Sequence, residues 1–323
     1  MKEEEIRPQD IFDEYLRLSR EDIKTYFLNA NYRMVSCPAC GEEGSFIFNK
    51  YGFNYKQCNG CKTIYMSFVP DSESFNKYYS DSPSTEYWAT TFYKETEDAR
   101  REKLWKPKAQ LILDKCINYD IKKFYDIGGG YGIFAEEFAK VSEADITVIE
   151  PSVHLSKVCR SKGITVIESF LENIDHSALT NERKCFVSFE LFEHLDKPKL
   201  FLESLYNLMN IDDIFIFTTL SGMGLDIQVL WEDSKAISPP HHLNFFNPKS
   251  IDILLKNLGF KLVEVTTPGK LDISIMNNSL DKIKDNFWKN FLEYSNELEL
   301  ENMQKYLSTN LLSSHMMVVC QKI

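Results

Sequence analysis

Short apolar runs alternate with segments of helical periodicity from Lys123 to the end of the chain, and few folds accommodate such a pattern. Helices between parallel strands make right-handed crossovers and cover both faces of the sheet that results. The runs with the character of strands are residues 123–127, 145–150, 164–168, 184–190, 213–220, 261–267 and 315–323. We therefore predict an α/β fold with a seven-stranded, mostly parallel sheet and helices on both faces.

The sequence ahead of this alternation has a different character, which predicts further parts before the sheet domain. Apolar residues at helical spacing indicate an N-terminal helix, with a break between Ser19 and Asp22. The expected parts are a helical segment at 1–33, a cysteine-bearing unit at 34–70, a helical connector at 71–118 and the sheet domain at 119–323, with a helical insertion at about 279–308 that covers one sheet edge.

Four of the eight cysteines form two Cys-x-x-Cys pairs, in "CPACG" and "CNGC", with 17 residues between the pairs. Each pair can place two thiolates on a tight turn, and two such turns supply a tetrahedral set of four sulfurs. This spacing predicts a structural zinc ribbon, with a redox pair or an iron site as the alternatives. Four thiolates saturate zinc, so the metal is expected to stabilise the fold without taking part in chemistry. The predicted ligands are Cys37, Cys40, Cys58 and Cys61.

The glycine-rich stretch "FYDIGGGYG" at 124–132 follows the first predicted strand of the sheet domain and fits some nucleotide-binding patterns better than others. No Lys follows the glycines, which excludes a phosphate-binding Walker loop. A dinucleotide fingerprint can be matched from Gly130 to Ala135, but it would leave Asp126 and two glycines between the strand and the fingerprint. An acid-x-Gly-x-Gly-x-Gly pattern, suited to S-adenosylmethionine, begins at Asp126 itself. Glu150, at the end of the second strand, can accept the hydroxyls of a ribose in either of these two ligands.

Over roughly residues 105–323 the chain resembles the class I S-adenosylmethionine-dependent methyltransferases, which have a Rossmann-like fold. The resemblance rests on "YDIGGGYG", "VIEPS", "VSFELFEHLDKP" and "PPHHLNFFNPKSI", which occur in that order. With "CPACG" and "CNGC" ahead of this domain, the whole chain looks like the zinc-ribbon methyltransferases associated with sugar and surface-polysaccharide biosynthesis. The resemblance implies a cofactor site made of Asp126, Gly128, Gly130 and Gly132 near the methionine portion, Glu150 at the ribose, Phe170 and Leu171 at the adenine, and Glu190.

Two segments are expected to bring catalytic side chains to the carboxyl edge of the sheet, where open α/β sheets bind their ligands. His194 follows the fourth strand and is our predicted general base, with Glu193 beside it. His241 and His242 lie in the loop after the fifth strand and are predicted to position the acceptor.

The same region offers a second interpretation, which involves a divalent metal. Glu190, Glu193 and His194, with a later His, resemble the metal sites of certain small-RNA and quinone-precursor O-methyltransferases. Two carboxylates and two imidazoles are a credible ligand set for Mg²⁺ or Mn²⁺.

Composition and charge restrict the partners. The net charge is −11 and no run of Lys and Arg is present, which disfavours nucleic acid as a partner. No apolar stretch is long enough to span a membrane and the N-terminus is too polar for a signal peptide, so we expect a cytoplasmic protein without membrane insertion. The predicted acceptor is a small hydroxylated molecule, such as a nucleotide sugar or glycan precursor. The alternatives are an RNA-modifying methyltransferase and a non-catalytic protein of the same fold, and the sequence does not predict the oligomeric state.

Overall fold

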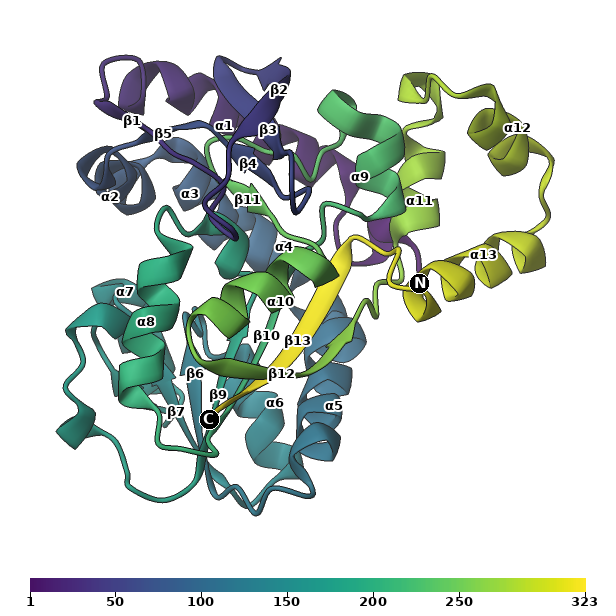
Figure 1. Cartoon of the computed structure of the whole chain (residues 1–323). Helices are drawn as coiled ribbons and strands as arrows, with labels where there is room; N and C mark the ends of the chain where they lie inside the picture. The colour runs from purple at the N-terminus through teal and green to yellow at the C-terminus, as the bar shows by residue number, and fades with distance from the viewer. The chain divides into compact units, whose positions relative to one another are not determined.

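The computed structural model describes residues 1–323, and the chain forms two compact units (Figure 1). The first unit comprises residues 1–97, 220–251 and 266–316, and the second comprises 98–219, 252–265 and 317–323. Residues 220–251 and 266–316, which we expected to continue the sheet domain, therefore belong to the unit that contains the N-terminus.

The second unit is built around a seven-stranded sheet in the order β12-β13-β10-β9-β6-β7-β8. Neighbouring strands from β10 to β8 are parallel. The strands are β6 (Lys123–Ile127), β7 (Asp145–Ile149), β8 (Thr165–Ile167), β9 (Lys184–Phe189), β10 (Ile214–Leu220), β12 (Phe260–Thr266) and β13 (His315–Lys322). All seven predicted strands are present, and the predicted α/β fold with a mostly parallel sheet is confirmed.

The register of the central strands positions the candidate site. Asp126 of β6 lies beside Val148 of β7 and Val187 of β9, so these strands end at nearly the same level. Because the strands are parallel, the residues that follow them share one edge of the sheet. Glu150 and Glu190 are the residues that follow β7 and β9.

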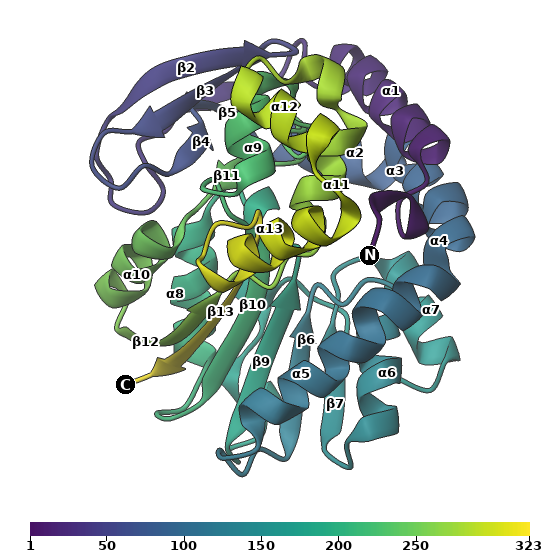
Figure 2. The same ribbon diagram turned by 90° about the vertical axis from the view of Figure 1, so that its right-hand side faces the viewer.

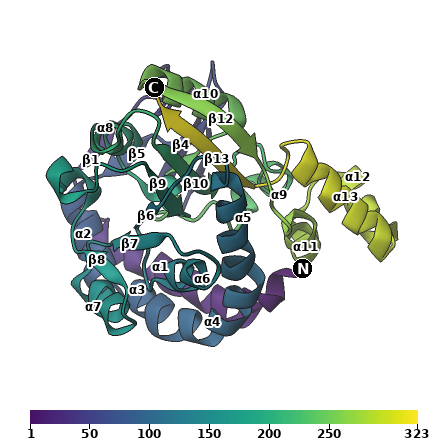
Figure 3. The same cartoon turned by 90° about the horizontal axis from the view of Figure 1, so that it is seen from below.

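Helices flank the sheet of the second unit. Figure 2 shows β10, β9, β6 and β7 side by side with α5 and α6 in front of them, and Figure 3 shows α8 on the opposite side of the sheet. The helices are α5 (Lys106–Cys116), α6 (Ile133–Val141), α7 (Val153–Ser161), α8 (Pro198–Leu208) and α10 (Pro248–Asn257). Single turns of 3₁₀-helix occur at Leu171–Asn173, His176–Ala178 and Phe192–His194, and a π-helical segment, Arg101–Trp105, precedes α5. The buried core between α5, α6 and the sheet includes Ile112, Phe124, Phe138, Val187 and Ile216.

The first unit contains the cysteine-bearing sheet, with strand order β11-β4-β3-β2. Its strands are β2 (Gly44–Lys50), β3 (Phe53–Cys58), β4 (Ile64–Met66) and β11 (Asn244–Phe245). β11 comes from a segment that follows β10 in the chain, and it pairs antiparallel with β4. The short strands β1 (Tyr32–Met34) and β5 (Phe68–Pro70) pair with each other. The predicted cysteine unit is thus completed by residues nearly 180 positions later.

Helices make up the rest of the first unit. Near the N-terminus these are α1 (Gln9–Tyr26), α2 (Ser72–Asp81), α3 (Pro83–Tyr87), a π-helical segment (Trp88–Phe92) and α4 (Tyr93–Arg100), with a 3₁₀ turn at Glu3–Glu5. Later come α9 (Leu225–Leu230), α11 (Asp272–Asn278), α12 (Asn286–Tyr294) and α13 (Glu297–Thr309), with 3₁₀ turns at Trp231–Asp233 and Leu280–Lys282. The insertion at about 279–308 shares a core with α9, which contributes Leu230 beside Ile283, Leu292 and Leu307.

The predicted break in the N-terminal helix is wrong, because α1 is continuous through Ser19 and Asp22. Both side chains are buried and satisfied. Ser19 Oγ donates to the Tyr15 carbonyl at 2.9 Å, and Asp22 accepts the backbone N–H of Ser84 at 2.9 Å. Tertiary partners therefore overcome the weak helix propensity of these two residues. No helix of the structure combines the length and the apolar character needed to cross a bilayer.

Candidate functional site

The glycine loop after β6 is shaped by two glycines with different functions. Gly130 has a φ of +56°, and a Cβ at this position would meet no atom within 4 Å, so the backbone borders open space. Gly132 has a φ of +71°, and a Cβ there would lie 2.6 Å from Ile164 Cδ1 and 3.0 Å from Cys159 Sγ. Gly132 therefore permits close packing at the start of α6, whereas Gly130 leaves room for a ligand.

Glu150 fixes the loop from the neighbouring strand. Its Oε2 accepts the backbone N–H of Gly130 at 3.0 Å, and its Oε1 accepts that of Ser152 at 2.9 Å. Burial raises the pKa of Glu150, while these two N–H groups oppose the increase. Cys159 holds the same loop, since its thiol donates to the Gly130 carbonyl at 3.1 Å. The sequence indicated the role of Glu150 at the site but offered no signal for Cys159.

Asp126, near the end of β6, has a buried carboxylate oxygen, Oδ2, without a hydrogen-bond partner. Burial, together with the negative charge of Glu150, raises the pKa of Asp126 to about 7, and the charge of Lys108 opposes this increase. An unpaired buried carboxylate is costly, and a cationic or N–H-bearing ligand would remove the cost. Asp126 and the open turn at Gly130 are thus two adjacent features that fit a positively charged ligand.

Glu190 follows β9 with a φ of +53°, which is unusual for a residue with a side chain. Thr218 of β10 holds it twice, because the Thr218 hydroxyl donates to Glu190 Oε1 at 2.6 Å and the Thr218 carbonyl accepts the Glu190 N–H at 3.2 Å. Strained backbone of this kind occurs preferentially at functional sites. Thr218 was not among the predicted residues.

Glu193 and His194 lie on the 3₁₀ turn that follows Glu190. The Glu193 side chain is buried, and its Oε2 accepts the hydroxyl of Thr219 at 2.9 Å. Burial and the charge of Glu190 raise the pKa of Glu193 to about 8. His194 is only half-buried. Of this predicted catalytic pair, His194 is therefore the more accessible side chain.

The predicted adenine-bordering residues, Phe170 and Leu171, follow β8 in the same unit. The Phe170 side chain is exposed and that of Leu171 is buried. These residues begin a single 3₁₀ turn, Leu171–Asn173, that packs against α8.

The two remaining predicted histidines belong to the first unit and have different surroundings. His241 is buried, and its Nε2 lies 2.7 Å from the Tyr15 hydroxyl and 2.5 Å from the Tyr78 hydroxyl. Burial raises the pKa of both tyrosines, so both hydroxyls stay protonated. His242 is half-buried, and its Nδ1 donates to the Ala236 carbonyl at 2.6 Å, which fixes one ring nitrogen as protonated.

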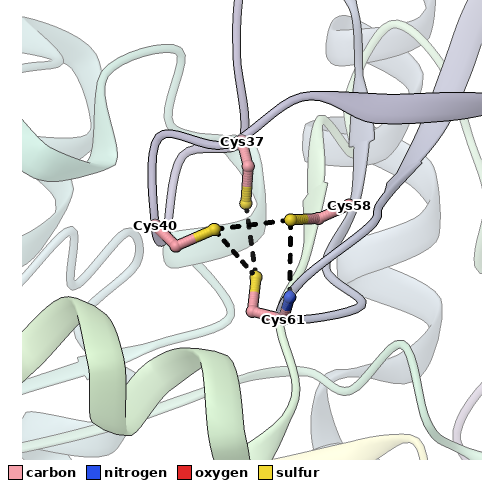
Figure 4. A group of neighbouring side chains, drawn as sticks. All are labelled: Cys37, Cys40, Cys58 and Cys61. Carbon is pink, nitrogen blue, oxygen red and sulfur yellow. Dashed lines mark hydrogen bonds between the residues drawn. The ribbon is translucent and has the colours of Figure 1, made fainter.

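The four predicted metal ligands form a single cluster in the first unit (Figure 4). The Sγ atoms of Cys37 and Cys61 are 3.4 Å apart, those of Cys40 and Cys58 3.4 Å, and those of Cys40 and Cys61 3.5 Å. All four cysteines are free of disulfides. Zinc–thiolate bonds of about 2.3 Å in a tetrahedron place the sulfurs about 3.8 Å apart, so the cluster has nearly the dimensions of a zinc site.

Part of the chain matches a known protein family. The family model described as "Methyltransferase domain" matches residues 98–265, which is just over half of the chain. The chain belongs to this methyltransferase family. It is a methyltransferase that uses S-adenosylmethionine, as the sequence resemblance implied.

Several solved structures are similar to this methyltransferase. The plantazolicin methyltransferase BamL, in complex with a triazolic desmethylPZN analog and SAH, is 15% identical, with 76% of this chain and 93% of that chain covered and a TM-score of 0.48. A SAM-dependent methyltransferase from Archaeoglobus fulgidus is 19% identical, with 67% and 94% covered and a TM-score of 0.45. Coclaurine N-methyltransferase is 14% identical, with 67% and 72% covered and a TM-score of 0.42. No curated protein matches the sequence.

The site of the methyltransferase fits its donor. S-adenosylmethionine carries a sulfonium and an ammonium, which are the charges that the unpaired oxygen of Asp126 requires. The open backbone at Gly130 leaves room for the donor. Of the ligands considered for the glycine loop, S-adenosylmethionine is therefore the one that both the family and the site support.

Proposed function

We propose that this methyltransferase acts in the cytosol and that its acceptor is a small hydroxylated molecule, namely a nucleotide sugar or another glycan precursor. The observation that supports S-adenosylmethionine as the methyl donor of this reaction is the unpartnered, buried carboxylate oxygen of Asp126 beside the open turn at Gly130. The sugar-like acceptor rests on the resemblance of the whole chain to zinc-ribbon methyltransferases.

His194 is our candidate for the general base. Transfer to a hydroxyl forms an oxygen–methyl bond, breaks the sulfur–methyl bond and releases the hydroxyl proton, which a base must accept. A half-buried imidazole after β9 is suited to this, whereas Glu193 is buried and holds the Thr219 hydroxyl. His241 and His242 are proposed to position the acceptor, with His241 acting through the hydroxyls of Tyr15 and Tyr78.

We further propose that the cysteine cluster binds a structural zinc ion. The sulfur–sulfur separations of 3.4–3.5 Å support this assignment. The Cys61 N–H, directed at Cys58 Sγ over 3.5 Å, and the Asn247 side chain, which donates to the Cys61 carbonyl at 2.9 Å, support the geometry from outside the cluster.

The charge of the ribbon favours a small acceptor over the RNA alternative. Residues 34–70 carry three lysines and two glutamates, a net charge of only +1. Lys56 pairs with Glu43 at 3.7 Å, and Lys50 donates to the Ser234 carbonyl at 2.7 Å. Burial lowers the pKa of Lys50 to about 8. An RNA-binding ribbon would be expected to present a basic face to phosphates.

The test is methyl transfer from labelled S-adenosylmethionine to a panel of uridine and thymidine diphosphate sugars, polyprenyl lipids and RNA, with and without Mg²⁺ or Mn²⁺. We expect label in a nucleotide sugar without added divalent metal. Transfer to RNA alone would overturn the proposed acceptor, and transfer that requires Mg²⁺ or Mn²⁺ would favour the Glu190, Glu193 and His194 metal site.

The role of His194 has its own test. The His194→Ala variant should keep its affinity for S-adenosylhomocysteine and lose at least about a hundredfold in turnover, as expected when a general base is removed. His154→Ala, in the exposed part of α7, is the matched control. Turnover unchanged in His194→Ala would remove this residue from the mechanism.

A further inference from the structure

Lys108 is a largely buried lysine of the second unit that no step of the proposed reaction uses. It lies on the first turn of α5, and only 14% of its side chain is exposed. Its Nζ lies 4.9 Å from the centroid of the Trp105 ring and 4.6 Å from that of the Phe189 ring. Two aromatic faces therefore hold the ammonium group in place.

The Lys108 ammonium has charge partners but makes no hydrogen bond in the structure. Its nearest carboxylate oxygen is Glu190 Oε1, at 3.9 Å, which is too far for a hydrogen bond. An ammonium has three N–H groups, and none of those of Lys108 has an acceptor in the protein. Lys108 is therefore available to donate hydrogen bonds to a bound ligand.

A second unsatisfied donor lies three residues earlier. The indole N–H of Trp105 is buried and has no hydrogen-bond partner. Trp105 ends the π-helical segment before α5, a local geometry that is frequent at functional sites. A buried indole N–H without a partner, close to an ammonium that no protein group accepts a hydrogen bond from, suits an anionic group.

The candidate S-adenosylmethionine site beside Lys108 and Trp105 contains mainly carboxylates. The charges of Glu190, Glu193 and Asp126 favour the charged form of Lys108, whereas the charge of Arg100 opposes it. Lys108 acts in return on Asp126, the residue with the unpaired oxygen. These carboxylates suit the sulfonium and ammonium of S-adenosylmethionine. They do not suit the carboxylate of its methionine portion, which requires a cation or an N–H donor within reach of the same site.

We infer that Lys108 binds the methionine carboxylate of the donor, with the indole N–H of Trp105 as a second hydrogen-bond donor to the same group. The inference rests on S-adenosylmethionine as the donor. Asp126 would then bind the ammonium of the methionine portion, and Lys108 would bind its carboxylate. Lys108 Nζ lies over the two rings and 3.9 Å from Glu190 Oε1.

The test compares two ligands that differ only in this carboxylate. They are S-adenosylhomocysteine and its decarboxylated form, S-adenosyl-3-thiopropylamine, and their affinities are measured by titration calorimetry. In Lys108→Met, the affinity for S-adenosylhomocysteine should fall about 10- to 100-fold, as expected for the loss of a charged hydrogen bond. The affinity for the decarboxylated ligand should change less than about twofold. Lys108→Arg should recover most of the loss.

Matched controls separate this role from a structural one. Lys106→Met changes an exposed lysine on the same turn of α5 and should leave both affinities unchanged. Equal losses for the two ligands in Lys108→Met would mean that Lys108 only supports the fold, and an unchanged affinity for S-adenosylhomocysteine would also overturn the inference. If the unmodified protein binds neither ligand, the assignment of the donor fails, which is a different result.

Discussion

The backbone N–H of Gly130 donates to the carboxylate of Glu150 over 3.0 Å, so the glycine loop after β6 is tied to the residue that ends the neighbouring strand. The second oxygen of Glu150 accepts the N–H of Ser152. Glu150 therefore shapes the glycine loop without any ligand, and its proposed role in donor binding would include the geometry of the loop itself.

Replacing Glu150 with Gln should remove one of the two hydrogen-bond acceptors that hold the loop. The amide offers one acceptor, so at least one of the two backbone N–H groups loses its partner. We expect the affinity for S-adenosylhomocysteine to fall about 10- to 100-fold, the range for a hydrogen bond to a charged group. Calorimetric titration measures this, with Glu143→Gln as an exposed control. An affinity within twofold of the unmodified protein would contradict the proposed role.

Donor binding should depend on pH through Asp126. Its pKa of about 7 in the free protein means that the carboxyl is mostly protonated below pH 7. A cationic ligand favours the ionised form and lowers this pKa, so binding at lower pH must first release a proton. The affinity for S-adenosylhomocysteine should weaken as pH falls below 7, by up to about tenfold per pH unit.

The proton can be counted directly. At pH 6.5 the binding enthalpy should differ between phosphate and imidazole buffers by the amount expected for proton release. Asp126→Asn should bind weakly and without this buffer dependence. A binding constant that is flat from pH 5.5 to 8.5 in the unmodified protein would show that Asp126 is not the titrating group.

Zinc removal should unfold the cysteine-bearing sheet. The purified protein is expected to contain one zinc ion per chain by elemental analysis, and Cys61→Ser should lose it, because one of four thiolate ligands is removed. Metal-dependent folding of small domains predicts a marked fall in thermal stability in this variant and in chelator-treated protein. Cys116→Ser, in the core of the second unit, should keep its zinc. Full metal content in Cys61→Ser would refute the assignment.

Asp226 should make the stability of the first unit depend on pH. The residue is fully buried, neither carboxylate oxygen has a hydrogen-bond partner, and burial followed by the charge of Asp272 raises its pKa well above the ordinary value of 3.8. Asp272 accepts hydrogen bonds from Ser313, the Ser314 N–H and Gln304, whereas Asp226 accepts none. Folding must therefore protonate Asp226.

The direction in which the free energy of unfolding changes with pH follows from the number of protons bound in each state. Above pH 3.8 the unfolded chain has lost this proton while the folded chain keeps it, so the free energy of unfolding falls as pH rises, by at most about 1.4 kcal/mol per pH unit for one proton. The decrease ends at the folded-state pKa. In Asp226→Asn, this slope should disappear from urea unfolding curves between pH 5 and 8. Identical slopes in both proteins would show that Asp226 is ionised in the folded state.

Local sequence patterns determined much of this protein. Alternating apolar periodicity marked the seven strands, because a strand or helix is encoded by neighbours a few residues apart. Parallel crossovers then place the ends of the strands at one edge, so the positions of Asp126 and Glu150 at the same edge of the sheet followed from the sequence. The spacing of the two cysteine pairs likewise predicted the cluster.

The tertiary structure alone decided the environment of each polar group. Tyr15 and His241 are 226 positions apart, yet they share a hydrogen bond that leaves His241 buried. Glu193 and His194 are adjacent in sequence, but the Glu193 side chain is buried and accepts a hydrogen bond from Thr219, whereas His194 is half-buried. Lys108 has the spacing of an ordinary helix residue and becomes a binding candidate only between two rings and several carboxylates. Periodicity encodes which face of an element is buried, whereas burial, charge and hydrogen bonding at a site depend on groups that only the folded chain brings together.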